Sequence, residues 1–196
     1  MRTNRSRAKA ALLPVLALAA FGLLVGCASR SLPGDFRPPD GSRVLSSVPF
    51  HPQDPNQCGP ASLAGILNHH GDPVKPDEIR REIFREDIQG TVSLDLALYP
   101  RTRGFATEWF AGEPDDLVRA VDAGRPLLVM VDYGFGGVAI NHYMVVVGYT
   151  PEAVVVNSGR TEHKRLPWSD FHARWDNAAR WTLRVTPNPP HSEVSP

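Results

Sequence analysis

One cysteine, Cys58, stands where its side chain could act as a nucleophile. The stretch HPQDPNQCGPASLAGIL places it directly before Gly59-Pro60, at the expected start of a helix. Unpaired backbone N–H groups and the helix dipole stabilise negative charge at such a position, which favours the reactive thiolate. The sequence therefore makes Cys58 a candidate nucleophile, and a small buried thiol with a purely structural role is the alternative.

The other cysteine, Cys27, follows a basic start and an uncharged, mostly apolar run over residues 10–26. This is the layout of a secretory signal peptide, which we assign to residues 1–26. The tetrapeptide LVGC that ends at Cys27 resembles the lipobox of bacterial lipoproteins, which implies lipidation of this thiol and a membrane anchor. The alternative is an N-terminal transmembrane anchor. Ala28, where an aspartate would favour the inner membrane, implies the outer membrane, with the protein facing the periplasm.

Lipidation of Cys27 would leave Cys58 as the last thiol in the chain, because the sequence contains two cysteines. Cys58 could then form no intramolecular disulfide. A lone thiol in an oxidising compartment is either buried and inert or present for its chemistry.

The segments that must position Cys58 differ along the chain in composition and in predicted secondary structure. Residues 27–47 contain the lipidation site and a stretch rich in Ser, Pro, Gly and charge, which we expect to be a flexible tether. Proline or acidic starts and helical apolar spacing then predict helices, and β-branched apolar runs predict strands. The expected helices cover 60–68, 76–85, 93–101 and 113–123, and the expected strands cover 105–110, 126–131, 142–149, 153–156 and 180–185.

Helices followed by antiparallel-looking strands predict an α+β fold. With 196 residues and 42% apolar side chains, the chain suffices for one domain, which we place at 48–186, with a disordered tail at 187–196. Basic and acidic residues both number 21, so no strong positive field indicates nucleic acid. The histidines show no metal-binding spacing and no CxxC occurs.

Three blocks of the sequence resemble the bacteriocin-processing, double-glycine leader peptidases and their stand-alone relatives in the papain-like clan. The blocks are VPFHPQDPNQCGPASLAGILNHHG, NHYMVVVGYT and VVVNSG, in the order cysteine, histidine, asparagine. The resemblance implies a papain-like cysteine peptidase fold, with the nucleophile at a helix start and a C-terminal antiparallel sheet.

The resemblance also implies roles for individual residues. Cys58 would be the nucleophile, His142 the general base and Asn157 the group that orients the imidazole. Gln53 and the backbone N–H of Cys58 would form the oxyanion hole, with Gln57 as a competitor because Gln53 lies five residues before the cysteine where the family usually has six. Asn157 also departs from the family, which most often has an aspartate followed by proline.

The implied activity is hydrolysis of a peptide bond in a peptide or protein substrate through a thioester acyl-enzyme, without metal or organic cofactor. We expect a pKa of Cys58 well below its ordinary value of about 8.5, because of the helix start and the imidazole. One alternative is a catalytically inactive lipoprotein that uses the same fold for binding or assembly. Another is a thiol acyltransferase or amidase with the same residues.

Overall fold

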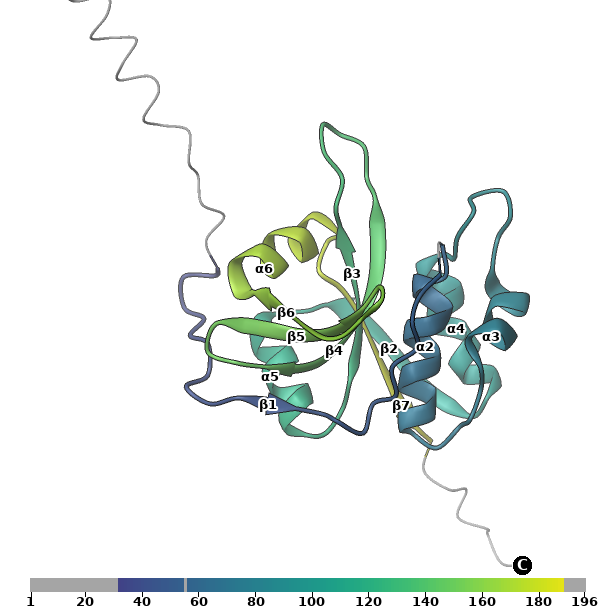
Figure 1. Cartoon of the computed structure of the whole chain (residues 1–196), viewed down its shortest axis with the longest axis horizontal. Coiled ribbons are helices and arrows are strands. Elements are labelled where there is room, and N and C mark those ends of the chain that lie inside the picture. Colours follow the sequence, from purple (N-terminus) through teal and green to yellow (C-terminus); the bar gives the residue numbers. More distant parts are fainter. Residues whose placement is uncertain (1–31, 55, 189–196) are drawn as a thin grey trace, which may run out of the picture. The chain divides into compact units, whose positions relative to one another are not determined.

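The computed structural model describes residues 32–54 and 56–188 (Figure 1). The predicted signal peptide, Cys27 and the predicted tail from residue 189 onward lie outside the described residues. Within the described part of the chain, no helix has the length and apolar character needed to cross a membrane.

The described residues form five helices, and local sequence signals predicted most of them. They are α2 (Cys58–His69), α3 (Pro76–Ile83), α4 (Ser93–Thr102), α5 (Pro114–Asp122) and α6 (Trp168–Asn177). Proline occupies the first position of α3 and of α5, where its missing N–H costs nothing. At the start of α5, the backbone N–H of Glu113 donates to the Asp116 carboxylate at 2.8 Å. These caps explain why two short polar helices begin at their prolines.

The strands form one antiparallel sheet with the order β2-β7-β3-β4-β5-β6, and β1 pairs with β4. They are β1 (Arg43–Val44), β2 (Phe105–Ala111), β3 (Leu127–Asp132), β4 (Asn141–Tyr149), β5 (Ala153–Ser158), β6 (Thr161–Pro167) and β7 (Trp181–Pro187). The predicted α+β class with an antiparallel sheet is confirmed.

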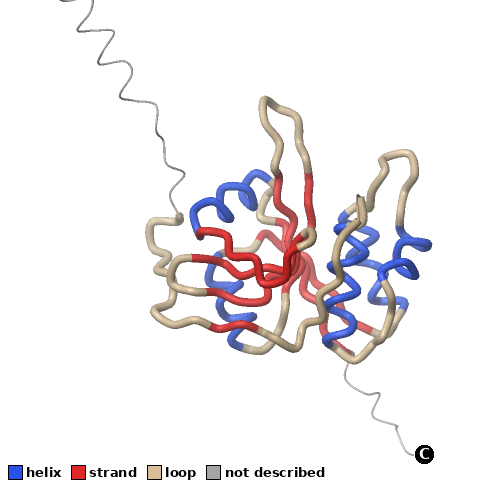
Figure 2. Tube along the Cα trace, viewed as in Figure 1, coloured by secondary structure: helices blue, strands red, loops and turns tan. Residues whose placement is uncertain are grey.

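Helices cover both faces of the sheet (Figures 1 and 2). Helices α2, α3 and α4 gather on one side, where α2 packs against β4. Helices α5 and α6 lie on the other side, and α6 packs against β3. Because both faces are covered, β4 and β5 are buried along almost their whole length, which explains their continuous apolar sequences.

The predicted boundary between tether and domain is wrong. Phe36 and Leu45 are buried in the core, and the Phe36 ring packs on Trp168 with 5.0 Å between the ring centroids. Strand β1 pairs with β4 at Gly148, where a Cβ atom would clash with the Arg43 carbonyl oxygen. The few apolar side chains in this polar stretch find sites that only the folded sheet provides, so the domain includes residues that the composition assigned to the tether.

Candidate active site

Cys58 is the first residue of α2 and is partly buried. The apolar face of this helix packs against β4, and one turn after the cysteine the Ser62 hydroxyl donates to the Tyr143 carbonyl oxygen at 3.4 Å. The thiol lies against the backbone N–H groups of Tyr143 and Gly59. Packing of α2 on β4 therefore brings the cysteine next to the residue that follows His142.

His142 is the second residue of β4 and is also partly buried. Its Nε2 lies 3.0 Å from Ser158 Oγ, at the end of β5. The imidazole packs on the Tyr133 ring, with 5.8 Å between the ring centroids and an interplanar angle of 60°. Strand pairing, the hydroxyl and the aromatic ring together restrict the orientation of the imidazole.

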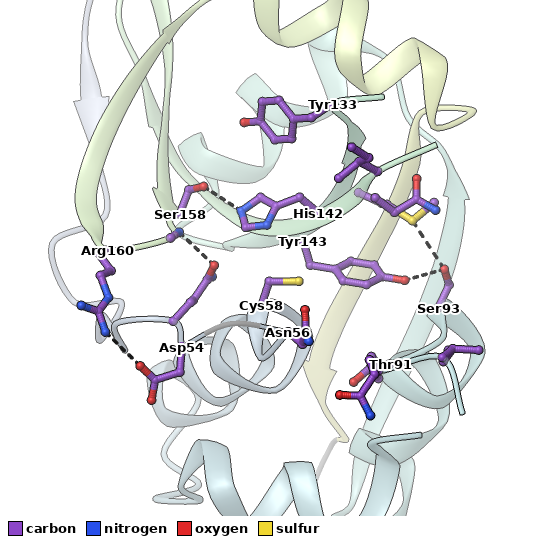
Figure 3. Close-up of a pocket in the computed structure, with 18 of the residues that line it drawn as sticks. Asp54, Asn56, Cys58, Thr91, Ser93, Tyr133, His142, Tyr143, Ser158 and Arg160 are labelled. Carbon is purple, nitrogen blue, oxygen red and sulfur yellow. Dashed lines mark hydrogen bonds and ion pairs between the residues drawn. The ribbon is translucent and has the colours of Figure 1, made fainter. Parts of the chain in front are cut away.

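Cys58 and His142 line the same cavity, which has a volume of about 1210 Å³ (Figure 3). The lining residues come from four segments, which are 53–58, 88–93, 130–143 and 158–164. One part of the lining is polar or charged and includes Arg160 and Lys164, whereas Ile88 and Ile140 are apolar. The cavity is large enough for several residues of a peptide.

Burial favours the neutral forms of both reactive groups. It raises the pKa of the Cys58 thiol, and the N–H groups of Tyr143, Gly59 and Cys58 itself only partly oppose this effect. Burial also lowers the pKa of His142, and the positive charge of Lys164 lowers it further. No hydrogen bond joins the Cys58 thiol to His142 among the described residues. The expected lowering of the pKa of Cys58 is therefore wrong for this structure, because desolvation outweighs the helix N-terminus.

Gln53 is buried and lines the cavity with Cys58. Its Oε1 accepts the Gly159 N–H at 2.9 Å, its Nε2 donates to Ser62 Oγ at 3.1 Å, and its backbone N–H donates to the Gly159 carbonyl oxygen at 2.9 Å. Gln57 is the residue before α2 and is not among the described residues that line the cavity. Of the two glutamines, the structure brings Gln53 to the cavity that contains Cys58.

Asn157 does not contact His142. Its Oδ1 accepts the backbone N–H of His163 at 3.1 Å, and its side chain borders a small cavity lined also by Ser62 and Gly65 of α2. The contact with the imidazole that we expected from Asn157 is made by its neighbour Ser158. Sequence reasoning missed Ser158, since nothing in the sequence distinguishes the two side chains before the strand register is known.

Within the described part of the chain, no group of three or more His, Cys, Asp or Glu side chains is arranged to hold a metal ion.

The chain resembles known peptidases in sequence and in fold. The model of the peptidase C39-like family matches residues 45–182. A putative C39-like peptidase from Bacillus anthracis has a TM-score of 0.63 and 18% identity, over 76% of this chain and 99% of that one. The peptidase domain of Streptococcus ComA, a bifunctional ABC transporter of a quorum-sensing pathway, has a TM-score of 0.59 and 24% identity, over 72% and 99%.

A third solved structure is a double-glycine motif protease of an AMS/PCAT transporter in complex with a leader peptide. It has a TM-score of 0.59 and 19% identity, over 79% of this chain and 100% of that one. A search of curated proteins gives no match. The structural neighbours share the α+β fold described above, and nearly their whole length is covered.

Proposed function

The chain belongs to the peptidase C39-like family, and we propose that it is a cysteine peptidase in which Cys58 is the nucleophile and His142 the general base. The family and the fold support a peptidase function. The observation that supports this assignment of roles most directly is the shared cavity, into which α2 delivers Cys58 and β4 delivers His142.

In the proposed reaction, the Cys58 sulfur attacks the carbonyl carbon of the scissile peptide bond. His142 accepts the thiol proton as the C–S bond forms, and the carbonyl oxygen becomes an oxyanion. The C–N bond then breaks, and His142 returns the proton to the leaving amine. A water molecule, deprotonated by the same imidazole, hydrolyses the thioester and regenerates the free thiol.

The oxyanion would be stabilised by Gln53 Nε2 and the backbone N–H of Cys58. Support for this role is that Gln53 lines the cavity and that its Oε1 is held by the Gly159 N–H. Two hydrogen bonds fix the carboxamide, one from the Gly159 N–H and one to Ser62 Oγ, and the second N–H of Nε2 remains to donate to the oxyanion with little reorganisation.

Because the Cys58 thiol and the His142 imidazole start neutral, the thiol proton is transferred during the reaction and not before it. The pKa of the thiol is raised and that of the imidazole is lowered. The protein therefore begins the reaction as thiol and imidazole, and proton transfer accompanies attack on the carbonyl. Such a mechanism requires a neutral His142, so activity is lost as the pH falls through the pKa of this residue.

Exposed apolar side chains around the cavity favour a substrate peptide that also has apolar side chains. Ile88 and Ile140 line the cavity and are 53% and 59% exposed, and Phe135 in the β3–β4 loop is 94% exposed. Figure 1 shows the β3–β4 loop and the α3–α4 loop reaching out on the same side of the fold. The neighbour solved with a leader peptide supports a peptide ligand for this cavity.

A second function, binding or assembly without turnover, is supported by one observation. The pKa of Cys58 is raised by burial, as expected for an inert thiol. A binding protein of this kind would retain the cavity and would not need the cysteine.

We also propose that the protein is a lipoprotein anchored through Cys27, on the outer membrane and facing the periplasm. Support comes from the basic start, the apolar run and the LVGC sequence of residues 24–27. The anchor would hold the peptidase domain close to a membrane surface.

A pooled library of peptidyl coumarin amides tests the activity across many peptide sequences at once. The purified protein should release coumarin from at least one pool, Cys58→Ala should release none, and Gln57→Ala, which alters a residue beside the cysteine but outside the cavity, should match the parent. Alkylation of Cys58 by iodoacetamide should slow in His142→Ala protein. Failure to cleave any pool, together with alkylation that is indifferent to His142, would overturn the peptidase assignment and favour the binding function.

A further inference from the structure

We propose that Ser158, rather than Asn157, is the positioning residue that orients the His142 imidazole for the reaction of Cys58. The inference rests on the proposed function, because orientation of the imidazole matters only if His142 acts as a base. It is carried by the contact between His142 Nε2 and Ser158 Oγ at 3.0 Å (Figure 3).

The register of β4 and β5 decides which side chain meets the imidazole. Val145 pairs with Asn157, and Val146 pairs with Val156. Because side chains alternate between the two faces of a strand, Asn157 shares the face of Val145, which packs toward α2. Ser158 shares the opposite face with the even-numbered residues of β4 that precede the register shift at Val146, among them His142.

The carboxamide of Asn157 is already engaged elsewhere. Its Oδ1 accepts the His163 N–H, a bond that stabilises the irregular backbone of β6 at a residue with φ of 50°. Its Nδ2 is buried without a hydrogen-bond partner in the described part of the chain. Asn157 therefore has a structural contact that explains its burial without any contact to the imidazole.

Ser158 is held firmly in place, as a positioning residue must be. It is 5% exposed, and the next residue, Gly159, exchanges two hydrogen bonds with Gln53, each of 2.9 Å. Arg160 forms an ion pair with Asp54 at 3.0 Å. These hydrogen bonds and this ion pair join the end of β5 to the segment that leads into α2 and Cys58.

In this proposal Ser158 Oγ is the acceptor of the contact, which corresponds to the Nε2–H tautomer of His142. If Ser158 Oγ accepts a hydrogen bond from Nε2–H, the lone pair of the imidazole is on Nδ1, which is the nitrogen left free to take the thiol proton. Figure 3 shows Ser158 and Cys58 on different sides of the ring. A hydroxyl group orients the ring without adding a negative charge, so it leaves the lowered pKa of His142 in place.

Two measurements on the purified protein test this assignment. NMR of isotope-labelled histidine, with the His142 signals identified by their absence from His142→Ala protein, should show the Nε2–H tautomer in the parent and in Ser158→Thr. Ser158→Ala, which removes only the hydroxyl, should give a mixture of tautomers. On a cleaved coumarin amide, Ser158→Ala should lower kcat about tenfold to a hundredfold with little change in KM, and Ser158→Thr should restore most of the rate.

Asn157→Ala is the matched control, one residue away. It should lower the melting temperature because the His163 N–H loses its acceptor, and it should leave the tautomer of His142 unchanged. If Asn157→Ala shifts the tautomer and Ser158→Ala does not, the assignment of Ser158 is overturned. If the tautomer depends on Ser158 but no peptide is cleaved, the positioning contact stands and the proposed peptidase function fails. The two proposals can therefore fail separately.

Discussion

Replacement of Gln53 by alanine should separate an oxyanion-stabilising role from a structural one. The side chain joins two elements, because its Oε1 accepts the Gly159 N–H and its Nε2 donates to Ser62 Oγ. Loss of a hydrogen bond that leaves its buried partner unsatisfied costs about 1 to 3 kcal/mol of folding stability. Gly159 is only partly buried, and the Ser62 hydroxyl keeps its hydrogen bond to the Tyr143 carbonyl oxygen. We therefore expect each bond to cost near the lower end of this range, which gives a loss of about 2 kcal/mol in the free energy of unfolding for both bonds together.

The loss of activity should be much larger than this loss of stability implies. Removal of one oxyanion-hole donor slows turnover about a hundredfold to a thousandfold, or about 3 to 4 kcal/mol of transition-state stabilisation. Iodoacetamide is a useful comparison, because alkylation of the thiol passes through no oxyanion. In folded Gln53→Ala protein, cleavage of a coumarin amide should therefore fall by this factor, and alkylation of Cys58 should stay within about threefold of the parent.

Two controls share the surroundings of Gln53. Ser62→Ala removes the hydrogen bond between Ser62 and Gln53 from the other partner and leaves the carboxamide in the cavity, so it should lower the melting temperature with little effect on kcat. Gln57→Ala should change neither quantity. Equal losses of cleavage and alkylation in Gln53→Ala, or a loss in Gln57→Ala as large as that in Gln53→Ala, would show that the reasoning about the oxyanion is wrong.

Three further changes test other parts of the structure. The charge of Lys164 helps to lower the pKa of His142, so Lys164→Gln should raise this pKa and move the acid limb of the kcat/KM profile to higher pH; an unchanged limb would remove Lys164 as a cause. In α2, Gly65→Ala should destabilise by about 1 to 2 kcal/mol in urea unfolding, since the added Cβ meets the Pro49 carbonyl oxygen at 2.7 Å and this outweighs the gain in helix propensity; a stabilised variant would contradict the packing. Cys27→Ser should release the protein from the membrane fraction or leave an uncleaved precursor, whereas mass spectrometry of a mature N-terminus elsewhere with an unmodified Cys27 would refute lipidation.

Local signals in the sequence were sufficient for most helices and for the buried strands. Pro76 and the acids after it start α3, and the predicted strand at 142–149 matches β4 to within one residue. These elements form where propensity, caps and apolar pattern agree, and each can be recognised within a window of about ten residues.

Two strands were missed because they depend on a partner strand. Strand β6 has the polar sequence TEHKRLP and is mostly exposed at the edge of the sheet, so it carries no apolar pattern. Strand β1 contains two exposed residues in a stretch that resembles a linker. Both pair with a buried neighbour, β5 or β4, and their conformation follows from hydrogen bonds that exist only after the sheet has formed.

The same division holds for the candidate site. The sequence by itself placed Cys58 at a helix start, as the structure has it, and proposed His142 as the base, because a short motif around each residue is visible before the fold is known. Which residue meets the imidazole was decided by the tertiary structure. The β4–β5 register shifts between Val146 and Gly148, and a shift of one residue exchanges the faces of all side chains beyond it. Burial likewise exists only in the folded protein, and it reversed the expected shift in the pKa of Cys58 because desolvation of the thiolate outweighs the nearby N–H groups.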